Sequence, residues 1–123
     1  MNFNEHKPIY LQISDYICER ILNDEYPEDE RIPSIRELGS LLGVNPNTVM
    51  RSYESLKSLE IIYDKRGVGF FTAPNAKKAV KSMFKNDFYE SELPLLIKKI
   101  ALLEIELDDL MKKIRKGLEL QNS

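Results

Sequence analysis

Residues 33–72 read PSIRELGSLLGVNPNTVMRSYESLKSLEIIYDKRGVGFFT, and this stretch decides the fold. Ser34, followed three residues later by Glu37, forms a capping box, in which each side chain accepts a hydrogen bond from the other residue's backbone amide. The apolar residues that follow share one side of a helix: Ile35, Leu38, Leu41 and Leu42. Gly43 adopts a positive φ more easily than other residues, so we expect it to end this helix.

A second helix is expected directly after the turn. Asn45 can cap it, and Pro46 suits its first position because no N–H is needed there. Helical spacing directs one set of side chains inward: Val49, Tyr53, Leu56 and Leu59. The opposite stripe carries Asn47, Met50, Arg51 and Glu54. A polar and basic helix, held at an angle by a preceding helix and a glycine-containing turn, is typical of a helix-turn-helix, so the stretch predicts a DNA-reading module.

Behind the two helices the sequence predicts a β-hairpin. Residues 60–63 and 69–72 have the β-branched and aromatic content of strands. Residues 64–68 lie between them, with glycines to close the turn and the cations Lys65 and Arg66 at its tip. A hairpin beside a recognition helix is a wing, and its cations can reach phosphates or the minor groove.

The segment ahead of the capping box completes the expected domain. Residues 7–24 repeat apolar positions at the helical period, and Pro8 suits the first turn. We expect this helix to lie across the two motif helices and to complete a three-helix core. Cys18 lies among its isoleucines, so burial as a small hydrophobe is expected rather than reactivity. Residues 25–32 form an acidic loop, and His6 has no companions at metal-ligand spacing.

Composition is that of a globular protein and argues against several classes. Of the 123 residues 42% are apolar and 31% charged, and no apolar run approaches the ~20 residues that span a bilayer. The start of the chain lacks a signal-peptide core, so a cytoplasmic location without membrane partners is expected. The single cysteine excludes an intramolecular disulfide. The sequence has no catalytic constellation, phosphate-binding glycine loop or metal-ligand cluster, so we expect no enzyme, cofactor or metal.

The charge balance is unusual for a DNA-binding domain. The chain carries 18 lysines and arginines against 20 acidic residues, a formal net charge of −2. Much of the acid ahead of the motif lies in residues 24–30. The cations can serve DNA binding only if they share one face.

The C-terminal part is predicted to be a helical region that pairs with a second copy. Residues 76–86 are basic and amphipathic, and Leu93 and Pro94 begin a further helix. Its 4-3-4-3-4 heptad spacing predicts one apolar seam: Leu96, Ile100, Leu103, Leu107, Leu110 and Ile114. An isolated helix cannot bury such a face, so it must pack on residues 76–86, on a second copy, or on both. A twofold dimer is the most common solution, and it addresses two half-sites about one helical turn apart.

The sequence resembles the N-terminal winged-helix domain of the GntR family of bacterial transcription factors. The resemblance runs collinearly over residues 7–73 through PIYLQISDYICERILN, RIPSIREL, GVNPNTVMRSYESL and KRGVGFFT. The NPNTV segment and the short tail are similar to the YtrA-type subfamily, whose members often regulate transporter operons. The resemblance implies a mainly α fold with a small β wing: a winged helix-turn-helix DNA-binding domain over residues 1–74, and a two-helix dimerisation region over residues 75–123.

The resemblance also implies DNA-binding residues in the capping-box segment, at the start of the recognition helix and in the wing. These are Arg36, Asn45, Asn47, Thr48, Arg66, Gly67 and Gly69. Position on the predicted elements adds Ser34, Arg51 and Lys65. Many relatives carry arginine where this chain has Pro46 and Met50, and here an arginine follows one place later. Their base contacts therefore cannot be transferred, and the operator sequence is not predicted.

Alternatives remain for one residue and for the whole chain. Arg36 could contact DNA, or it could pair with Glu37 or Asp64 on a solvated surface. We expect a homodimeric transcriptional regulator that acts as a repressor on an inverted-repeat operator in double-stranded DNA. The alternative is a protein-interaction adaptor that uses the winged helix as a scaffold. A two-helix tail does not easily enclose a pocket of the usual ~300 Å³, so an effector, if one exists, would bind in a crevice of the dimer.

Overall fold

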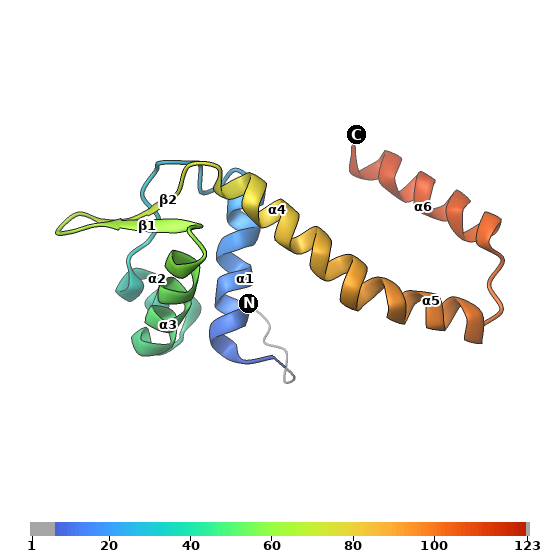
Figure 1. Ribbon diagram of the computed structural model, residues 1–123, viewed down its shortest axis with the longest axis horizontal. Coiled ribbons are helices and arrows are strands. Elements are labelled where there is room, and N and C mark those ends of the chain that lie inside the picture. The colour runs from blue at the N-terminus through green and yellow to red at the C-terminus, as the bar shows by residue number, and fades with distance from the viewer. Residues whose placement is uncertain (1–6, 123) are drawn as a thin grey trace. The chain divides into compact units, whose positions relative to one another are not determined.

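The computed structural model describes residues 7–122, so His6 lies outside the described residues. The elements along the chain are α1 (Ile9–Leu22), α2 (Ile35–Leu42), α3 (Pro46–Ser58), β1 (Ile62–Lys65), β2 (Gly69–Thr72), α4 (Ala76–Asp87), the π-helical turn η1 (Phe88–Glu92), α5 (Leu93–Leu102) and α6 (Leu107–Gln121) (Figure 1). This order confirms the predicted fold class, a winged helix-turn-helix followed by C-terminal helices. The chain divides into two compact units, residues 1–83 and residues 84–123.

The core of the first unit lies between its three N-terminal helices. The buried side chains come from α1, α2 and α3: Ile13, Ile17, Cys18, Ile21, Leu38, Val49, Tyr53 and Leu56. Burying an apolar side chain of this size stabilises the fold by ~1.5–3 kcal/mol. The Ser52 hydroxyl also donates to the Tyr10 carbonyl oxygen at 2.5 Å, which fastens α3 to α1. Burial raises the pKa of the Cys18 thiol to about 12, so this residue is the unreactive core hydrophobe that the sequence predicts.

Both motif helices start and stop where their capping residues predict. The Glu37 amide donates to Ser34 Oγ at 3.0 Å, and the Ser34 amide donates to Glu37 Oε1 at 3.3 Å. Gly43 ends α2 with a φ of 67°. The Asn47 amide donates to Asn45 Oδ1 at 2.8 Å, which caps α3. All of these contacts join residues close together in the sequence, so the turn between α2 and α3 is defined by local sequence.

Two leucines predicted to face inward are exposed instead. Leu41 is 66% exposed, because helical spacing places it at the edge of the apolar side of α2, on the opposite side of Leu38 from Leu42. Leu59 is 53% exposed, because it follows the last helical residue of α3 and the chain turns away at Glu60, whose φ is 60°. The inward stripe of α3 therefore ends at Leu56 rather than at Leu59.

The wing begins later than predicted. β1 pairs antiparallel with β2 in a register that joins Ile62 to Thr72 and Lys65 to Gly69. The first strand was expected over residues 60–63, but the turn at Glu60 delays it, and residues 64 and 65 then belong to the ladder rather than to the loop. The hairpin turn is therefore shorter than expected. The segment before α2 adds a bridge to the other side of β2, where the Ile32 amide donates to the Phe70 carbonyl oxygen at 2.9 Å.

The helices after the wing begin in the first unit and continue in the second. Ala76 and Val80 of α4 are buried in the first unit. η1 follows where the Leu93 amide donates to the Phe88 carbonyl oxygen, a π-type bond. Pro94 has no N–H to continue the α-helical ladder, which accounts for this irregular turn. No helix within residues 7–122 is long and apolar enough to cross a bilayer.

The predicted heptad seam does not lie on one continuous helix. Leu103 caps α5, Glu104 has a φ of 53°, and Glu106 caps α6. The chain turns here although residues 103–106 contain neither glycine nor proline. The seam positions are thus divided between two helices, with Leu96 and Ile100 on the first. Leu107, Leu110 and Ile114 lie on the second.

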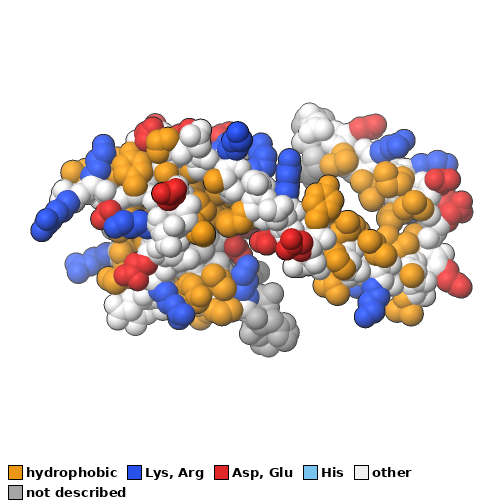
Figure 2. Space-filling model, in the orientation of Figure 1, with side chains coloured by type: hydrophobic (Ala, Val, Ile, Leu, Met, Phe, Trp, Pro, Cys, Tyr) orange, Lys and Arg blue, Asp and Glu red, His pale blue; other side chains and the backbone are white. Residues whose placement is uncertain are grey.

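The tail helices leave their apolar side chains uncovered. Neither α5 nor α6 contains a buried residue. The large hydrophobic side chains exposed on them are Leu95, Leu96, Ile97, Leu102, Leu107, Met111, Ile114, Leu118 and Leu120. Figure 2 shows hydrophobic side chains gathered over this part of the chain. An exposed apolar surface of this extent is typical of an interaction site.

Candidate nucleic-acid interface

The start of α3 presents polar side chains, while several of its amides are already used. Asn45 and Asn47 are exposed, and Thr48 is half-buried. The Asn47 amide bonds the Asn45 side chain, and the Thr48 amide bonds the Asn45 carbonyl oxygen at 2.9 Å. Pro46 has no amide hydrogen to offer. A phosphate or base approaching this end of α3 would therefore meet the amide and hydroxyl side chains rather than free backbone donors.

Arg51 lies on the outward side of α3 but its guanidinium is held toward α1. Its Cζ atom lies 3.9 Å from the centre of the Tyr10 ring. The Tyr10 backbone is fixed in turn, because its carbonyl oxygen accepts hydrogen bonds from Ser52 and Ser14. A cation–π contact at an exposed site is worth ~0.5–1 kcal/mol, so it orients the guanidinium without locking it. Sequence periodicity could not show this contact, since it joins residues 41 apart in the chain.

Arg36 is exposed, and the two carboxylates that could have engaged it have other partners. Glu37 Oε1 lies 3.8 Å from Arg31 Nη2 and accepts from the Ser34 amide. Asp64 Oδ1 lies 2.9 Å from Lys57 Nζ, and this hydrogen bond lowers the pKa of Asp64. Within residues 7–122 Arg36 forms no ion pair, which leaves its guanidinium free for an external anion. Ser34, half-buried beside it, is occupied as the cap of α2.

The wing carries one oriented cation and one extended cation. Lys65 Nζ lies 4.6 Å from the centre of the Phe71 ring, which stacks on Tyr63. Arg66 is exposed at the turn, next to Gly67, which has a φ of 79°. Figure 2 shows basic side chains at this end of the hairpin. The wing tip therefore presents positive charge to its surroundings.

Gly69 shapes the wing, and its contact with DNA stays a prediction. Its φ is 146°, and an added Cβ would lie 2.8 Å from Arg31 Nε. The glycine therefore lets Arg31 approach β2, where the backbone also bridges to Phe71. Sequence reasoning missed Arg31, an exposed cation beside the wing. The RIPSIREL motif contains it, but only the long-range contact with Gly69 shows where it lies.

Much of the acidic loop is paired with neighbouring groups. Asp24 Oδ1 lies 2.9 Å from Lys77 Nζ, and Asp29 Oδ1 accepts from the Tyr63 hydroxyl at 3.1 Å. Glu25 lies 3.7 Å from the Arg20 guanidinium. The two ion pairs, of Asp24 with Lys77 and of Glu25 with Arg20, offset part of the negative charge where it occurs. The net charge of −2 for the whole chain therefore does not describe the local electrostatic potential around Arg36 and Arg66.

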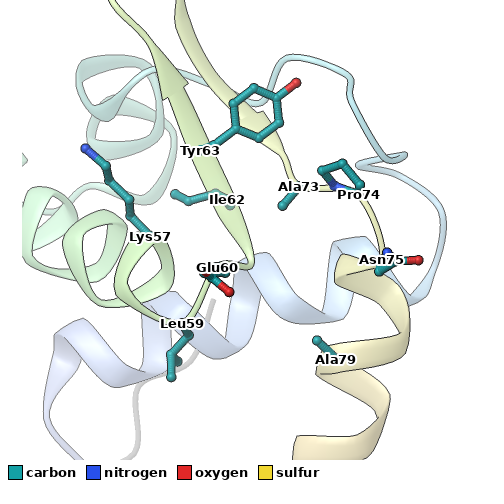
Figure 3. Close-up of a pocket in the computed structure, with 9 residues that line it drawn as sticks. All are labelled: Lys57, Leu59, Glu60, Ile62, Tyr63, Ala73, Pro74, Asn75 and Ala79. Carbon is teal, nitrogen blue, oxygen red and sulfur yellow. The ribbon is translucent and has the colours of Figure 1, made fainter.

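A groove of about 680 Å³ lies in the first unit between the end of α3, β1 and the start of α4 (Figure 3). Its lining residues are Lys57, Leu59, Glu60, Ile62, Tyr63, Ala73, Pro74, Asn75 and Ala79. Two of its polar groups are already engaged, because Lys57 pairs with Asp64 and the Tyr63 hydroxyl bonds Asp29. The groove would therefore contact a ligand mainly through apolar side chains. No group of three potential metal ligands occurs in the described part of the chain.

The fold and this surface define a winged helix-turn-helix DNA-binding protein. Residues 9–72 match the sequence model for bacterial regulatory proteins of the gntR family. The chain belongs to the GntR family. It is therefore a DNA-binding transcriptional regulator and not an enzyme, and the family assignment favours the regulator over the adaptor.

Individual relatives extend the likeness beyond the winged helix. The chain is 32% identical over 113 residues to the uncharacterized HTH-type transcriptional regulator YhcF of Bacillus subtilis, and the match covers 92% of each chain. It is 39% identical over 70 residues to the HTH-type transcriptional repressor YtrA of the same organism, covering 57% of this chain and 54% of YtrA. A putative transcriptional regulator of the GntR family from Bacteroides thetaiotaomicron has a similar structure, with a TM-score of 0.75, 43% identity and coverage of 93% and 99%. The short tail is thus part of the likeness, and the chain is of the YtrA type.

Proposed function

We propose that this protein is a homodimeric, cytoplasmic repressor of an operon. Its relative YtrA is named as a transcriptional repressor, which supports repression. A transporter operon is the proposed target, because members of the YtrA-type subfamily often regulate such operons. In this proposal α3 enters the major groove of each half-site, and the wing at residues 64–69 lies along the flanking DNA. The observation that carries it is the outward side of α3, which is exposed within its unit at Asn47, Met50, Arg51 and Glu54. Arg36 is exposed on the preceding helix and forms no ion pair within residues 7–122. An element of this kind suits the major groove, which admits a helix.

The predicted DNA contacts divide by chemistry. Arg36, Arg66 and Lys65 supply positive charge to phosphates, which gives affinity and its salt dependence. Asn47 and Thr48 supply hydrogen-bonding side chains at the start of α3. Among the remaining members, Ser34 and Asn45 cap their helices and can also contact DNA, and Gly67 and Gly69 shape the wing. Arg51 adds a guanidinium that its contact with Tyr10 orients.

The tail is proposed to join two copies of the chain. The uncovered apolar side chains of α5 and α6 must be removed from water, and a second copy offers an identical surface. This assigns DNA binding to residues 1–74 and dimerisation to residues 75–123, with the six seam residues at the interface. An effector would bind between the copies.

Selection of binding sites from genomic DNA with the purified protein tests the proposal. We expect an inverted repeat whose half-sites are centred about 10–10.5 bp apart, or a multiple of this, because each copy docks on one face of the duplex. Affinity for the selected duplex should fall steeply as salt rises. Enrichment of an unsymmetrical site would contradict the dimer, and the lack of any enrichment would contradict the operator proposal.

Replacing Arg36 with alanine should weaken operator binding about tenfold and reduce the salt slope by about one, because one phosphate contact is lost. Fluorescence anisotropy of a labelled operator at several salt concentrations measures both quantities. Arg115→Ala is the matched control, since it removes an exposed arginine from the tail. If affinity and slope are unchanged in Arg36→Ala, Arg36 does not belong to the interface.

A further inference from the structure

One side chain on the outward stripe of α3 is neither polar nor buried. Met50 is 43% exposed, and it lies three residues after Asn47 and four before Glu54. This spacing places the three side chains on one side of the helix. An unbranched thioether in water at this position is not part of the core that Val49 and Tyr53 form behind it.

Arg51, the residue next to Met50 that could also reach the major groove of DNA, is engaged by another side chain. The Arg51 Cζ atom lies 3.9 Å from the centre of the Tyr10 ring, so the guanidinium is oriented toward Tyr10 of α1. Next to Met50 the stripe then offers the amide of Asn47 and the carboxylate of Glu54. A carboxylate is an acceptor only, and it is repelled by phosphate oxygens. The middle of the stripe is therefore suited to base edges rather than to the backbone.

We propose that Met50 is a specificity-determining residue that contacts the C5-methyl group of a thymine in the major groove. Among the base edges in that groove only thymine presents an apolar group, and apolar side chains are its natural partners. The thioether is flexible and polarizable, so it can follow a methyl group over a range of approach angles. The inference rests on the proposed docking of α3 and adds to it the identity of one base that each copy reads.

Replacing single thymines by deoxyuridine in the selected operator tests this contact. The substitution removes the methyl group and keeps every hydrogen-bonding atom. With the wild-type protein we expect a loss of about fourfold in affinity at one thymine in each half-site, the value of one buried methyl-sized group. At the other thymines we expect no change.

Three variants then assign the effect to Met50. Met50→Ala should bind the thymine and deoxyuridine operators equally, whereas Met50→Leu should retain the discrimination because it keeps an apolar side chain. Leu59→Ala is the matched control: it removes an exposed apolar side chain nine residues further on, at the C-cap of α3, and it should discriminate as the wild type does.

The outcomes separate this inference from the proposed function. A selected operator whose affinity ignores every thymine methyl, or whose half-sites lack thymine, would overturn the Met50 contact and leave operator binding intact. Discrimination that persists in Met50→Ala would also overturn it, because another residue would then make the contact. A protein that selects no DNA would overturn both.

Discussion

Replacing Tyr53 with alanine should lower the free energy of unfolding by about 3–5 kcal/mol. Tyr53 is 1% exposed, and its ring meets Phe70 of β2 edge-on, with 4.9 Å between the ring centroids. Its hydroxyl donates to the Pro33 carbonyl oxygen at 2.5 Å, directly ahead of the capping box. One side chain thus connects α3 to the wing and to the start of α2, so its loss should loosen the whole winged helix.

Urea unfolding followed by circular dichroism measures this change. Tyr53→Phe keeps the ring and should cost only about 1 kcal/mol, the net value of the hydrogen bond. Tyr89→Ala is the matched control, because it removes an exposed tyrosine and should change stability by about 0.5 kcal/mol or less. A loss in Tyr53→Ala no larger than that in Tyr53→Phe would mean that the ring is not a structural link.

The parts of the fold that could be predicted are those determined by neighbouring residues. The capping box of Ser34 and Glu37, the positive φ of Gly43 and the cap at Asn45 each involve residues at most three apart, so the sequence reveals them. Burial of Leu38 follows from the same local pattern. Together these features define the turn that presents α3.

The parts that escaped prediction depend on contacts between distant residues. Nothing in the periodicity of α3 shows that Tyr10 will hold Arg51, or that Arg31 will lie against Gly69. The seam failed as a continuous helix for a different reason. An apolar spacing of three and four residues fits one long helix and two short ones equally well. The positive φ falls on Glu104 rather than on a glycine, so the sequence does not reveal the break.

The break at Glu104 divides the tail into two helices, and this changes how its apolar residues can be buried. A single long helix would offer one seam to one partner. Two helices without buried residues offer two apolar faces, so a pair of chains can form a four-helix arrangement. The six seam residues can then meet those of a second copy although no continuous heptad joins them.

Replacing Leu107 with glutamate should therefore split the proposed dimer and weaken operator binding about 100-fold or more, because each copy then binds its half-site alone. Leu107 is 61% exposed in the single chain and begins α6, where a negative charge is favourable, so the fold of each copy should survive. Sedimentation should show the mass of one chain, 14.3 kDa. Lys116→Glu places a carboxylate on the polar side of α6, outside the apolar set, and should remain dimeric. A Leu107→Glu variant that sediments as two chains would show that the interface lies elsewhere, since an unpaired carboxylate buried in an apolar interface costs about 3–5 kcal/mol.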